Sequence, residues 1–357
     1  MKSEQREPQA AQEQLNQAID NEARSTGFSG AVSVTRKEQA LTARAYGYAN
    51  LAEERLNQFN TRFGIASGCK LFTAVAVCQL VEQGKLSFDS KVLTVLQDYE
   101  FPRFSPEITV HQLLTHSSGI PDYFDEEVMD DFAALWKETP MYTLRRPADF
   151  LPLFAALPMK FTPGERFHYN NAGYIMLGLL VEAVSGMKFT DYVEQQIFRP
   201  CGMTDSGYFA QDALPANTAL GYTENEHGET INNVYSLPVV GGPDGGAFVT
   251  AADMQRLWIG LFWHTLLLPA TTELLLTPHI REDEDSYYGY GVWIQVRNGK
   301  VIKYHVMGSD PGVSFRSAVY PASGVTFTAL CNRSRGAYRM MQVLEANLPL
   351  QQEDDHP

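Results

Sequence analysis

Hydrophobic positions alternate with polar ones, or follow one another without interruption, in short runs near both ends of the chain. Seven runs of this kind cover residues 30–36, 40–48, 62–66, 288–297, 300–306, 314–320 and 325–331. A period of two is typical of a β-strand with one buried face, and most of the segments between neighbouring runs are short enough for antiparallel turns. The pattern predicts antiparallel strands at both ends of the chain, which most economically belong to one sheet.

Apolar residues recur at helical spacing in other segments. The predicted helices cover residues 8–24, 67–83, 110–116, 171–184, 251–264 and 338–348. Thr250 is the expected N-cap of one helix, and Gly84 and Gly186 are the expected C-terminal stops of two others. We therefore expect an α/β fold of the α+β type, with an antiparallel sheet, flanking helices and an inserted, mainly helical region.

The same pattern divides the chain into regions. Residues 1–89 and 247–350 are expected to form a discontinuous α/β sheet region. Residues 90–246, where the strand signal fades, are expected to form the mainly helical region. The polar and acidic residues 351–357 predict a disordered tail.

The composition is that of an ordinary globular protein, with 44% hydrophobic and 20% charged residues in 357. The formal charge of −14, from 42 acidic and 28 basic residues, disfavours nucleic acid as a partner. No stretch is long and apolar enough for a membrane span, and the N-terminus has no apolar signal core. We expect a cytoplasmic protein as given, or a periplasmic or secreted one if a leader was removed; the oligomeric state is not predicted.

The residues that commonly bind metals show no metal-site pattern. The four cysteines lie far apart without a C-x-x-C pair, so we expect reduced, mostly buried thiols and no zinc site. A run of carboxylates between residues 122 and 163 is interpreted as a solvated acidic face rather than a metal site: Asp125, Glu126, Glu127, Asp130 and Asp131. Together with its aromatic residues, this segment would also suit a lid over a pocket. No metal and no cofactor are expected.

Ser67 and Lys70 are the strongest candidates for chemistry. Ser67 follows an apolar run and begins a predicted helix, and Lys70 projects from the same helix face three residues later. A hydroxyl at a helix N-terminus, with an amine beside it and free backbone N–H groups nearby, can act as a nucleophile. The alternative is a serine N-cap beside a solvated lysine. A second pair with this spacing, Ser185 and Lys188, surrounds Gly186 and is interpreted as a helix C-cap.

Five segments in this order resemble the serine β-lactamase and penicillin-binding-protein superfamily. They are Ser-Gly-Cys-Lys at 67–70, Leu-Leu-Thr-His-Ser-Ser-Gly-Ile-Pro at 113–121, Phe-Thr-Pro-Gly-Glu-Arg-Phe-His-Tyr-Asn-Asn-Ala-Gly-Tyr at 161–174, Gly-Gly at 245–246 ahead of Asp253, and Gly-Ser-Asp-Pro-Gly at 308–312. The resemblance is to the branch with class C β-lactamases, D-Ala-D-Ala carboxypeptidases, D-aminopeptidases and esterases. It runs from about residue 27 to about residue 333.

The resemblance implies roles for particular residues. Ser67 would be the nucleophile, Lys70 and Tyr169 the proton-transfer pair, and Asn171 a polar positioner in the Y-x-N motif. Which of Lys70 and Tyr169 is the base stays open. A second Y-x-N match at residues 48–50 lies at the end of a predicted strand and is interpreted as structural.

The third motif of the resemblance is a K-T-G or H-x-G triplet, which aligns with residues 306–308. Gly308 would allow close approach of the substrate, and the backbone N–H groups of Ser67 and Ser309 would form the oxyanion hole. Val306 departs from the motif because it cannot bind a substrate carboxylate. His305 is adjacent and should face the other side of the strand, although a shift or bulge would bring it into the cleft.

These residues predict a serine hydrolase that forms an acyl-enzyme with a small-molecule ester or amide, without metal or cofactor. Because Val306 offers no partner for a carboxylate, an esterase-like preference is expected. One alternative is a β-lactamase, D-Ala-D-Ala carboxypeptidase or D-aminopeptidase. Another, from a different class, is a catalytically silent binding or sensor domain of the same fold.

Overall fold

The computed structural model describes residues 6–350, with side chains described from residue 11, and its main feature is an eight-stranded antiparallel sheet. The strand order is β2 (Gln39–Tyr46), β1 (Gly30–Arg36), β14 (Val325–Cys331), β13 (Val313–Tyr320), β12 (Lys300–Asp310), β11 (Trp293–Arg297), β10 (Ser286–Tyr288) and β9 (Ile280–Arg281). The N-terminal hairpin joins the C-terminal strands through β1 and β14, where Val32 lies opposite Ala329. The prediction of one antiparallel sheet built from both ends of the chain is confirmed.

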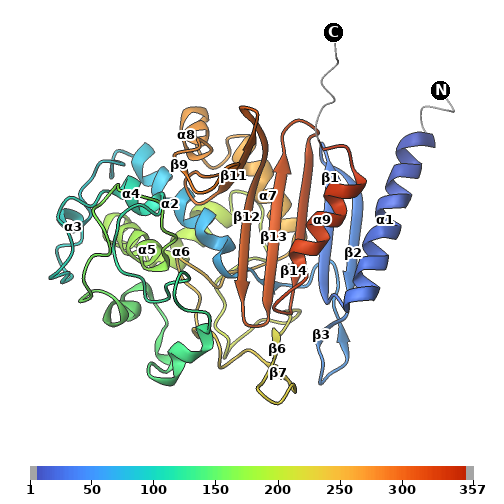
Figure 1. The fold of residues 1–357 in the computed structure, drawn as a ribbon, viewed down its shortest axis with the longest axis horizontal. Coiled ribbons are helices and arrows are strands. Elements are labelled where there is room, and N and C mark those ends of the chain that lie inside the picture. The colour runs from blue at the N-terminus through green and yellow to red at the C-terminus, as the bar shows by residue number, and fades with distance from the viewer. Residues whose placement is uncertain (1–5, 351–357) are drawn as a thin grey trace, which may run out of the picture.

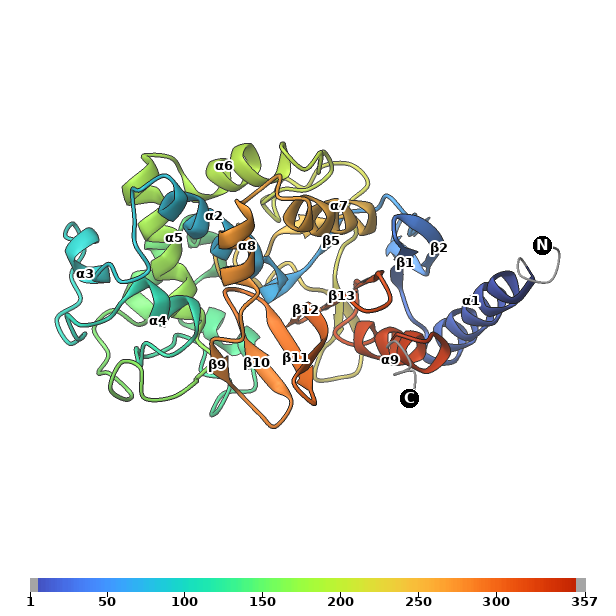
Figure 2. The same cartoon turned by 90° about the horizontal axis from the view of Figure 1, so that it is seen from above.

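Helices cover both faces of this sheet (Figures 1 and 2). Helices α1 (Arg6–Thr26) and α9 (Ala337–Asn347) pack over one face, which presents Val34 and Phe327. On the other face, α7 (Ala251–Phe262) contacts β1 and β14, and its Trp258 indole N–H donates to Ser317 Oγ on β13 at 2.9 Å. Alternate residues of each central strand therefore enter two separate hydrophobic cores.

The remaining helices lie beside the sheet, at the left of Figure 1. Helix α2 (Lys70–Glu82) packs against α5 (Asn171–Ser185), α6 (Phe189–Val193) and α8 (Pro269–Leu275). The short helices α3 (Val92–Val95) and α4 (Val110–Leu114) both contact α5. Most residues of α2 and α5 are buried, so both are apolar on nearly all sides. In the described part of the chain, no helix taken singly has the length and apolarity to cross a membrane.

Three two-stranded sheets complete the fold. They are β3 (Tyr48–Asn50) with β4 (Arg55–Leu56), β5 (Phe63–Gly64) with β8 (Phe248–Val249), and β6 (Tyr222–Glu224) with β7 (Thr230–Asn232). The run at residues 62–66 was expected as a third strand beside the N-terminal hairpin, and this expectation is wrong. Its short strand β5 pairs with β8 outside the main sheet, because Ile65 N–H donates to Ala247 O there.

Two further strand predictions need correction. The run at residues 288–297 is broken into β10 and β11 by a turn in which Gly291 has a φ of 70°. Strand β12 does not end at residue 306 but continues to Asp310, so Gly308 and Ser309 belong to the strand and only residues 311–312 turn. These changes place the third motif inside a regular ladder.

The helix predictions are confirmed to within a few residues by α1, α2, α4, α5, α7 and α9. The Thr250 side chain caps α7 by accepting the Asp253 N–H at 3.1 Å, and Gly186 ends α5 with a φ of 71°. All four cysteines are free thiols, three of them buried, as expected. The tail predicted at residues 351–357 lies outside the described residues.

Candidate active site

Ser67 lies in a 3-10 turn, η1 (Ala66–Cys69), between strand β5 and helix α2. Ala66 has a φ of 45°, in the left-handed region that costs a non-glycine residue roughly 1 kcal/mol or more. The turn is held because Gly246 N–H donates to Ala66 O at 3.2 Å and Gly68 N–H donates to Ile65 O at 2.9 Å. This strained turn places the half-buried Ser67 at the edge of a pocket.

Lys70 is the centre of the hydrogen-bond network around Ser67. Its side chain is 1% exposed, and its Nζ lies 2.9 Å from Ser67 Oγ, 2.8 Å from Asn171 Oδ1 and 2.7 Å from the backbone oxygen of Asp244. The three partners come from η1, from the start of α5 and from the loop before β8. The structure thus brings together Ser67, Lys70 and Asn171, as the sequence predicted.

The amide of Asn171 is oriented by Asp122. Asn171 Nδ2 donates to Asp122 Oδ2 and to Phe124 O, both at 3.3 Å, so Oδ1 must face Lys70. The Asp122 carboxylate also accepts the backbone N–H groups of Asn171 and Ala172 at 2.7 and 2.9 Å, at the N-terminus of α5. Burial raises the pKa of Asp122 to about 7, against the lowering effect of those hydrogen bonds and of Lys70.

A glycine-rich loop at residues 241–246 brings the Asp244 carbonyl to Lys70. Pro243 O accepts the Thr73 hydroxyl of α2 at 2.6 Å, and an added Cβ at Gly178 of α5 would lie 2.0 Å from Pro243. The loop is therefore packed between the two central helices. The Tyr123 hydroxyl donates to the Asp244 carboxylate, whose pKa is raised by burial.

Tyr169 lies beside both Ser67 and Lys70. Lys70 Nζ is 4.9 Å from the centre of the Tyr169 ring, and the ring stacks on Trp293 of β11 at 6.1 Å between centroids. The pKa of the Tyr169 hydroxyl is well above 10, first because of burial and then because of Glu126, while its hydrogen bond with Ser67 lowers it. The phenol, rather than the phenolate, is therefore its resting form.

His116 supports the segment that carries Tyr169. It is buried, has a φ of 56°, and its Nδ1 accepts the Asn170 N–H at 3.0 Å while its backbone oxygen accepts the His168 N–H at 2.8 Å. Its ring contacts Tyr169 with centroids 4.4 Å apart. Burial and then Lys70 hold the pKa of His116 well below 6.5, so the imidazole is neutral and Nδ1 is free to accept.

Gly308 allows β12 to approach the nucleophile. An added Cβ at Gly308 would lie 2.0 Å from Ile65 O and 2.9 Å from Ser67 N, so only glycine fits between the strand and the turn. Ser309 follows it in the strand and lines the same pocket as Ser67. The predicted oxyanion donors are thus on neighbouring pieces of backbone.

Val306 and His305 point in opposite directions from β12. Val306 shares the strand face of Gly308 and is 2% exposed in the core, whereas His305 shares the face of Lys303. The register with β13 is continuous here, so no bulge turns His305 into the cleft. His305 reaches the site only through Trp293, whose ring lies between it and Tyr169, and burial lowers the pKa of His305 to about 3.

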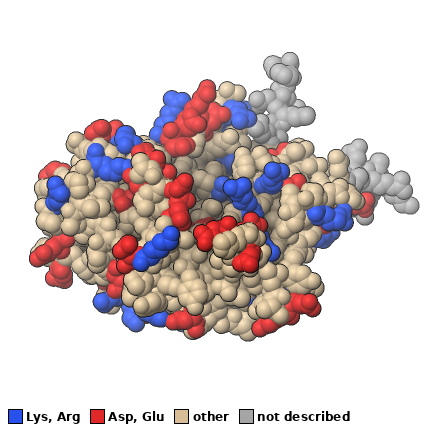
Figure 3. Space-filling model, turned by 60° about the horizontal axis from the view of Figure 1, so that its bottom comes forward, with Lys and Arg blue, Asp and Glu red and all other residues tan. Residues whose placement is uncertain are grey.

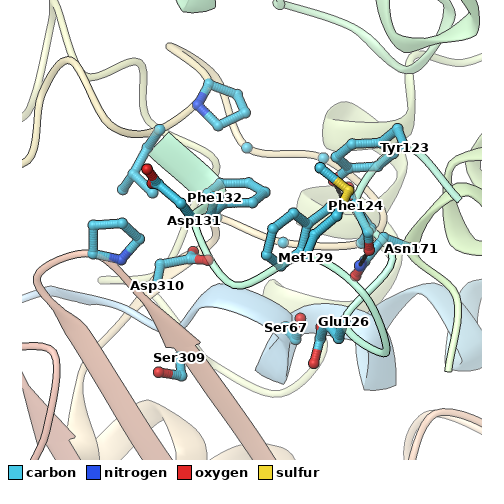
Figure 4. A pocket seen from close by; sticks show the side chains of 18 of the residues that line it. Ser67, Tyr123, Phe124, Glu126, Met129, Asp131, Phe132, Asn171, Ser309 and Asp310 are labelled. Carbon is cyan, nitrogen blue, oxygen red and sulfur yellow. Dashed lines mark hydrogen bonds between the residues drawn. The ribbon is translucent and has the colours of Figure 1, made fainter. Parts of the chain in front are cut away.

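The pocket beside Ser67 has a volume of about 600 Å³ and an acidic lining. Figure 4 shows Ser309 and Asp310 of β12 on one side, with the loop residues Phe124, Glu126 and Met129 nearer Asn171. Five carboxylates line it, together with one arginine: Glu126, Asp130, Asp131, Asp244, Asp310 and Arg335. Burial, with the nearby Asp244 carboxylate, raises the pKa of Asp310 to about 8.

The acidic run is mostly solvated, as expected: Glu126, Glu127, Asp130 and Asp131 are exposed, whereas Asp125 is partly buried. Ligand atoms of Asp125, Glu127 and His168 lie within 4.8 Å of one another, an arrangement that could hold a metal ion. The Lys160 ammonium already lies among them, 2.6 Å from His168 Nε2, 3.7 Å from Glu127 and paired with Asp125. In the described structure, a lysine takes the place that a cation would need.

Three groups at the site were not predicted from the sequence. The Asp244 carbonyl is a backbone group on a loop, and Trp293 and Asp122 reach the site only through the folding of distant segments. The glycines around Asp244 are the one local signal that could have indicated a close backbone approach there.

Comparison with known proteins agrees with this geometry. Residues 15–347 match the model of the β-lactamase family. Penicillin-binding protein 4* of Bacillus subtilis is 28% identical over 335 residues, covering 89% of this chain and 71% of that protein. The crystal structure of a penicillin-binding protein from Bacillus halodurans is 54% identical, covers 92% of this chain and 100% of that one, and has a TM-score of 0.89. An octameric penicillin-binding protein homologue from Pyrococcus abyssi is 25% identical, covers 95% of this chain and 78% of that one, and has a TM-score of 0.81.

Proposed function

Because this chain belongs to the β-lactamase family, in the superfamily of serine β-lactamases and penicillin-binding proteins, we propose that it is a serine hydrolase that forms an acyl-enzyme with a small ester or amide. The observation that carries the proposal is the set of hydrogen bonds around Lys70. Asn171 Oδ1 and the Asp244 carbonyl can only accept, so each takes one N–H of the amine. In the neutral amine, the remaining lone pair faces the Ser67 hydroxyl.

This arrangement supports Lys70 as the base. As Ser67 Oγ bonds to the substrate carbonyl carbon, its proton passes to Lys70 Nζ. When the bond to the leaving oxygen or nitrogen breaks, that atom takes a proton from the Tyr169 hydroxyl, which recovers one from Lys70. Water then attacks the acyl-enzyme with the same groups acting in reverse, releasing the acid and restoring Ser67.

The oxyanion of the tetrahedral intermediate is assigned to the backbone N–H groups of Ser67 and Ser309. The close contact of Gly308 with the Ser67 turn supports this assignment, because it brings the two backbone segments together. Asn171 positions Lys70, and Asp122 in turn orients Asn171. No metal takes part in these steps as proposed.

The charges of the pocket favour substrates without a carboxylate next to the scissile bond. The third motif of the superfamily begins with a lysine or a histidine. In this chain that position is Val306, which is buried in the core. Glu126 lines the pocket beside Ser67 and would repel such a carboxylate, whereas Asp310, whose pKa is raised to about 8, adds little charge at neutral pH and has no cation to offer it. An esterase-like or neutral-amide specificity is therefore our first choice over a β-lactamase, D-Ala-D-Ala carboxypeptidase or D-aminopeptidase.

The test is hydrolysis of 4-nitrophenyl butyrate and of the cephalosporin nitrocefin by wild type, Ser67→Ala, His305→Ala and Val306→Lys. We expect the wild type to cleave the ester readily and nitrocefin slowly, and Ser67→Ala to cleave neither. Efficient nitrocefin turnover that collapses in His305→Ala would favour the β-lactam or peptide alternative. Absence of any Ser67-dependent turnover would favour a silent binding domain.

A further inference from the structure

A second cavity opens on the far side of Ser309, and its walls are basic. It has a volume of about 930 Å³ and is lined by four arginines: Arg316 on β13, Arg333 and Arg335 after β14, and Arg339 in α9. Among the described residues that line it, Glu224 is the one carboxylate. We call this cavity the arginine pocket. Such an excess of positive charge is unexpected in a chain with a formal charge of −14.

Three of the four arginines have no counter-ion among the described residues. Arg339 comes within 4.0 Å of Glu22, but no described carboxylate pairs with Arg316, Arg333 or Arg335. The partly buried Arg316 guanidinium donates to the carbonyl of its neighbour Phe315 at 3.3 Å, and burial lowers the pKa of Arg316. Arg316 and Arg333 are partly buried, whereas Arg335 and Arg339 are exposed. Partly buried like charges without a counter-ion are costly, so the inner part of the pocket is suited to an anion.

Two of the four guanidinium groups also lie against aromatic rings. Arg316 lies over the Tyr338 ring at 5.5 Å, and Arg333 lies over the Tyr222 ring at 5.4 Å. Stacking restricts each guanidinium plane, and the N–H groups at the edge of that plane are the ones that bind carboxylate and phosphate oxygens in pairs. One Arg316 N–H group is already used by the Phe315 carbonyl. Helix α9 begins here after Gly336, where the Ala337 N–H donates to Ser314 Oγ at 3.3 Å, and the positive end of the helix adds to the field.

The arginine pocket adjoins the pocket of Ser67. Both are lined by Thr223, Ser309, Ser334 and Arg335. On the face shown in Figure 3, basic side chains gather at one side of the central hollow and acidic ones lie across from them. A molecule that extends from Ser67 past Ser309 therefore passes from an acidic environment into a basic one.

We propose that the arginine pocket binds an anionic group, a carboxylate or a phosphate, that the substrate carries several bonds away from the scissile bond. The identification of the anion as part of a substrate rests on the proposed hydrolase function, whereas anion binding by the pocket does not. Arg316 and Arg333, stacked on tyrosines, provide the fixed donors. Arg335, which lines both pockets, provides the donor nearest the reaction centre.

The binding part is tested by calorimetry on the Ser67→Ala variant with phenyl phosphate and phenylacetate, which separate phosphate from carboxylate recognition. We expect saturable binding of at least one probe, weakened about tenfold or more by adding Arg333→Gln and Arg335→Gln. Arg199→Gln is the matched control, because Arg199 is exposed on another surface and paired with Glu194. No saturable binding, or equal weakening by Arg199→Gln, would overturn the anion site.

The substrate part is tested with two pairs of esters that differ in one remote charge. The first pair is 4-nitrophenyl butyrate and 4-nitrophenyl hydrogen glutarate. The second is the butyrate esters of 4-hydroxyphenylpropanamide and of 4-hydroxyphenylpropanoate. In at least one pair, the wild type should have the higher kcat/KM on the anionic member, and Arg333→Gln with Arg335→Gln should remove that preference.

Each outcome bears on a different part of the proposal. Anion binding without any preference in the two pairs would overturn the substrate assignment and leave the pocket as a site for a separate anion. Failure to hydrolyse any of the four esters would count against the proposed function, and calorimetry would still decide whether the pocket binds anions.

Discussion

Lys70 and Tyr169 act on the same proton in our account, so their effects should not be independent. Both surround the Ser67 hydroxyl, and Lys70 Nζ lies against the Tyr169 ring. Lys70→Ala and Tyr169→Phe should each lower kcat by about 10²–10⁴, with little change in KM. The double variant should be hardly worse than the more damaged single variant. Multiplicative losses, measured as kcat for all four proteins, would show that the two side chains do not share a proton path.

Gly308 tests whether the backbone contact between β12 and the Ser67 turn is required. In Gly308→Ala, the methyl group would lie 2.0 Å from Ile65 O and would force the two oxyanion donors apart. We expect kcat to fall by about 10²–10³, the scale of a lost oxyanion donor. Gly64→Ala is the control, because its added Cβ would meet nothing closer than Val313 at 3.5 Å. Equal activity of the two variants would contradict the assignment.

Residue-level prediction from the sequence succeeded where the signal is local. The spacing of Ser67 and Lys70 on one helical turn fixes their contact, whatever the rest of the fold does. The carbonyl of Asp244 and the ring of Trp293 could not be found in the same way, because a backbone group carries no sequence signature and Trp293 reaches Tyr169 from a strand that begins 124 positions later.

Among the elements, α5 bears directly on the site, because its N-terminus holds Asn171. Asp122 accepts the first backbone N–H groups of this helix, and burial raises the Asp122 pKa to about 7. The folded Asp122 carboxyl therefore holds its proton more tightly than the unfolded one does. Its contribution to the free energy of unfolding is complete below about pH 4 and is lost as the pH rises through 7.

Urea unfolding of wild type and Asp122→Asn between pH 5 and 8 checks this expectation. The free energy of unfolding of the wild type, relative to the variant, should fall as the pH rises, by at most about 1.4 kcal/mol per pH unit. The variant serves as the reference because it keeps the other titrating groups. A difference that stays constant or increases with pH would show that the helix N-terminus, rather than burial, dominates the Asp122 pKa.

The two strand boundaries were predicted wrongly for one physical reason. A glycine within an apolar run can mark the end of a strand, or it can allow a close contact with a distant segment. Gly308 resembled a strand end, but it lies within β12 because the Ser67 turn leaves no room for a side chain. Gly291 interrupts an apolar run because α2 passes beside it, and an added Cβ would lie 2.7 Å from Lys70 O. Alternation alone cannot reveal such contacts between distant segments.

At the scale of the whole molecule, both ends of the chain build one sheet, and α1 packs against α9 (Figure 1). The hydrophobic pattern was sufficient for this prediction because the strand segments alternate or run apolar and α1 and α9 each bury one side against the sheet. It could not give the placement of charge. Acids and arginines from distant segments gather on opposite sides of Ser309, whereas the sequence shows only a net charge of −14.

The central claim is that Ser67 is a nucleophile activated by Lys70, and covalent labelling tests it most directly. A fluorophosphonate reacts with an activated serine by forming an Oγ–phosphorus bond and releasing fluoride. Intact-mass and peptide mass spectrometry should find one adduct on Ser67 in the wild type, none in Ser67→Ala, and labelling slowed by about 10²–10⁴ in Lys70→Ala. An adduct on another serine, or labelling of Lys70→Ala at the wild-type rate, would contradict the account.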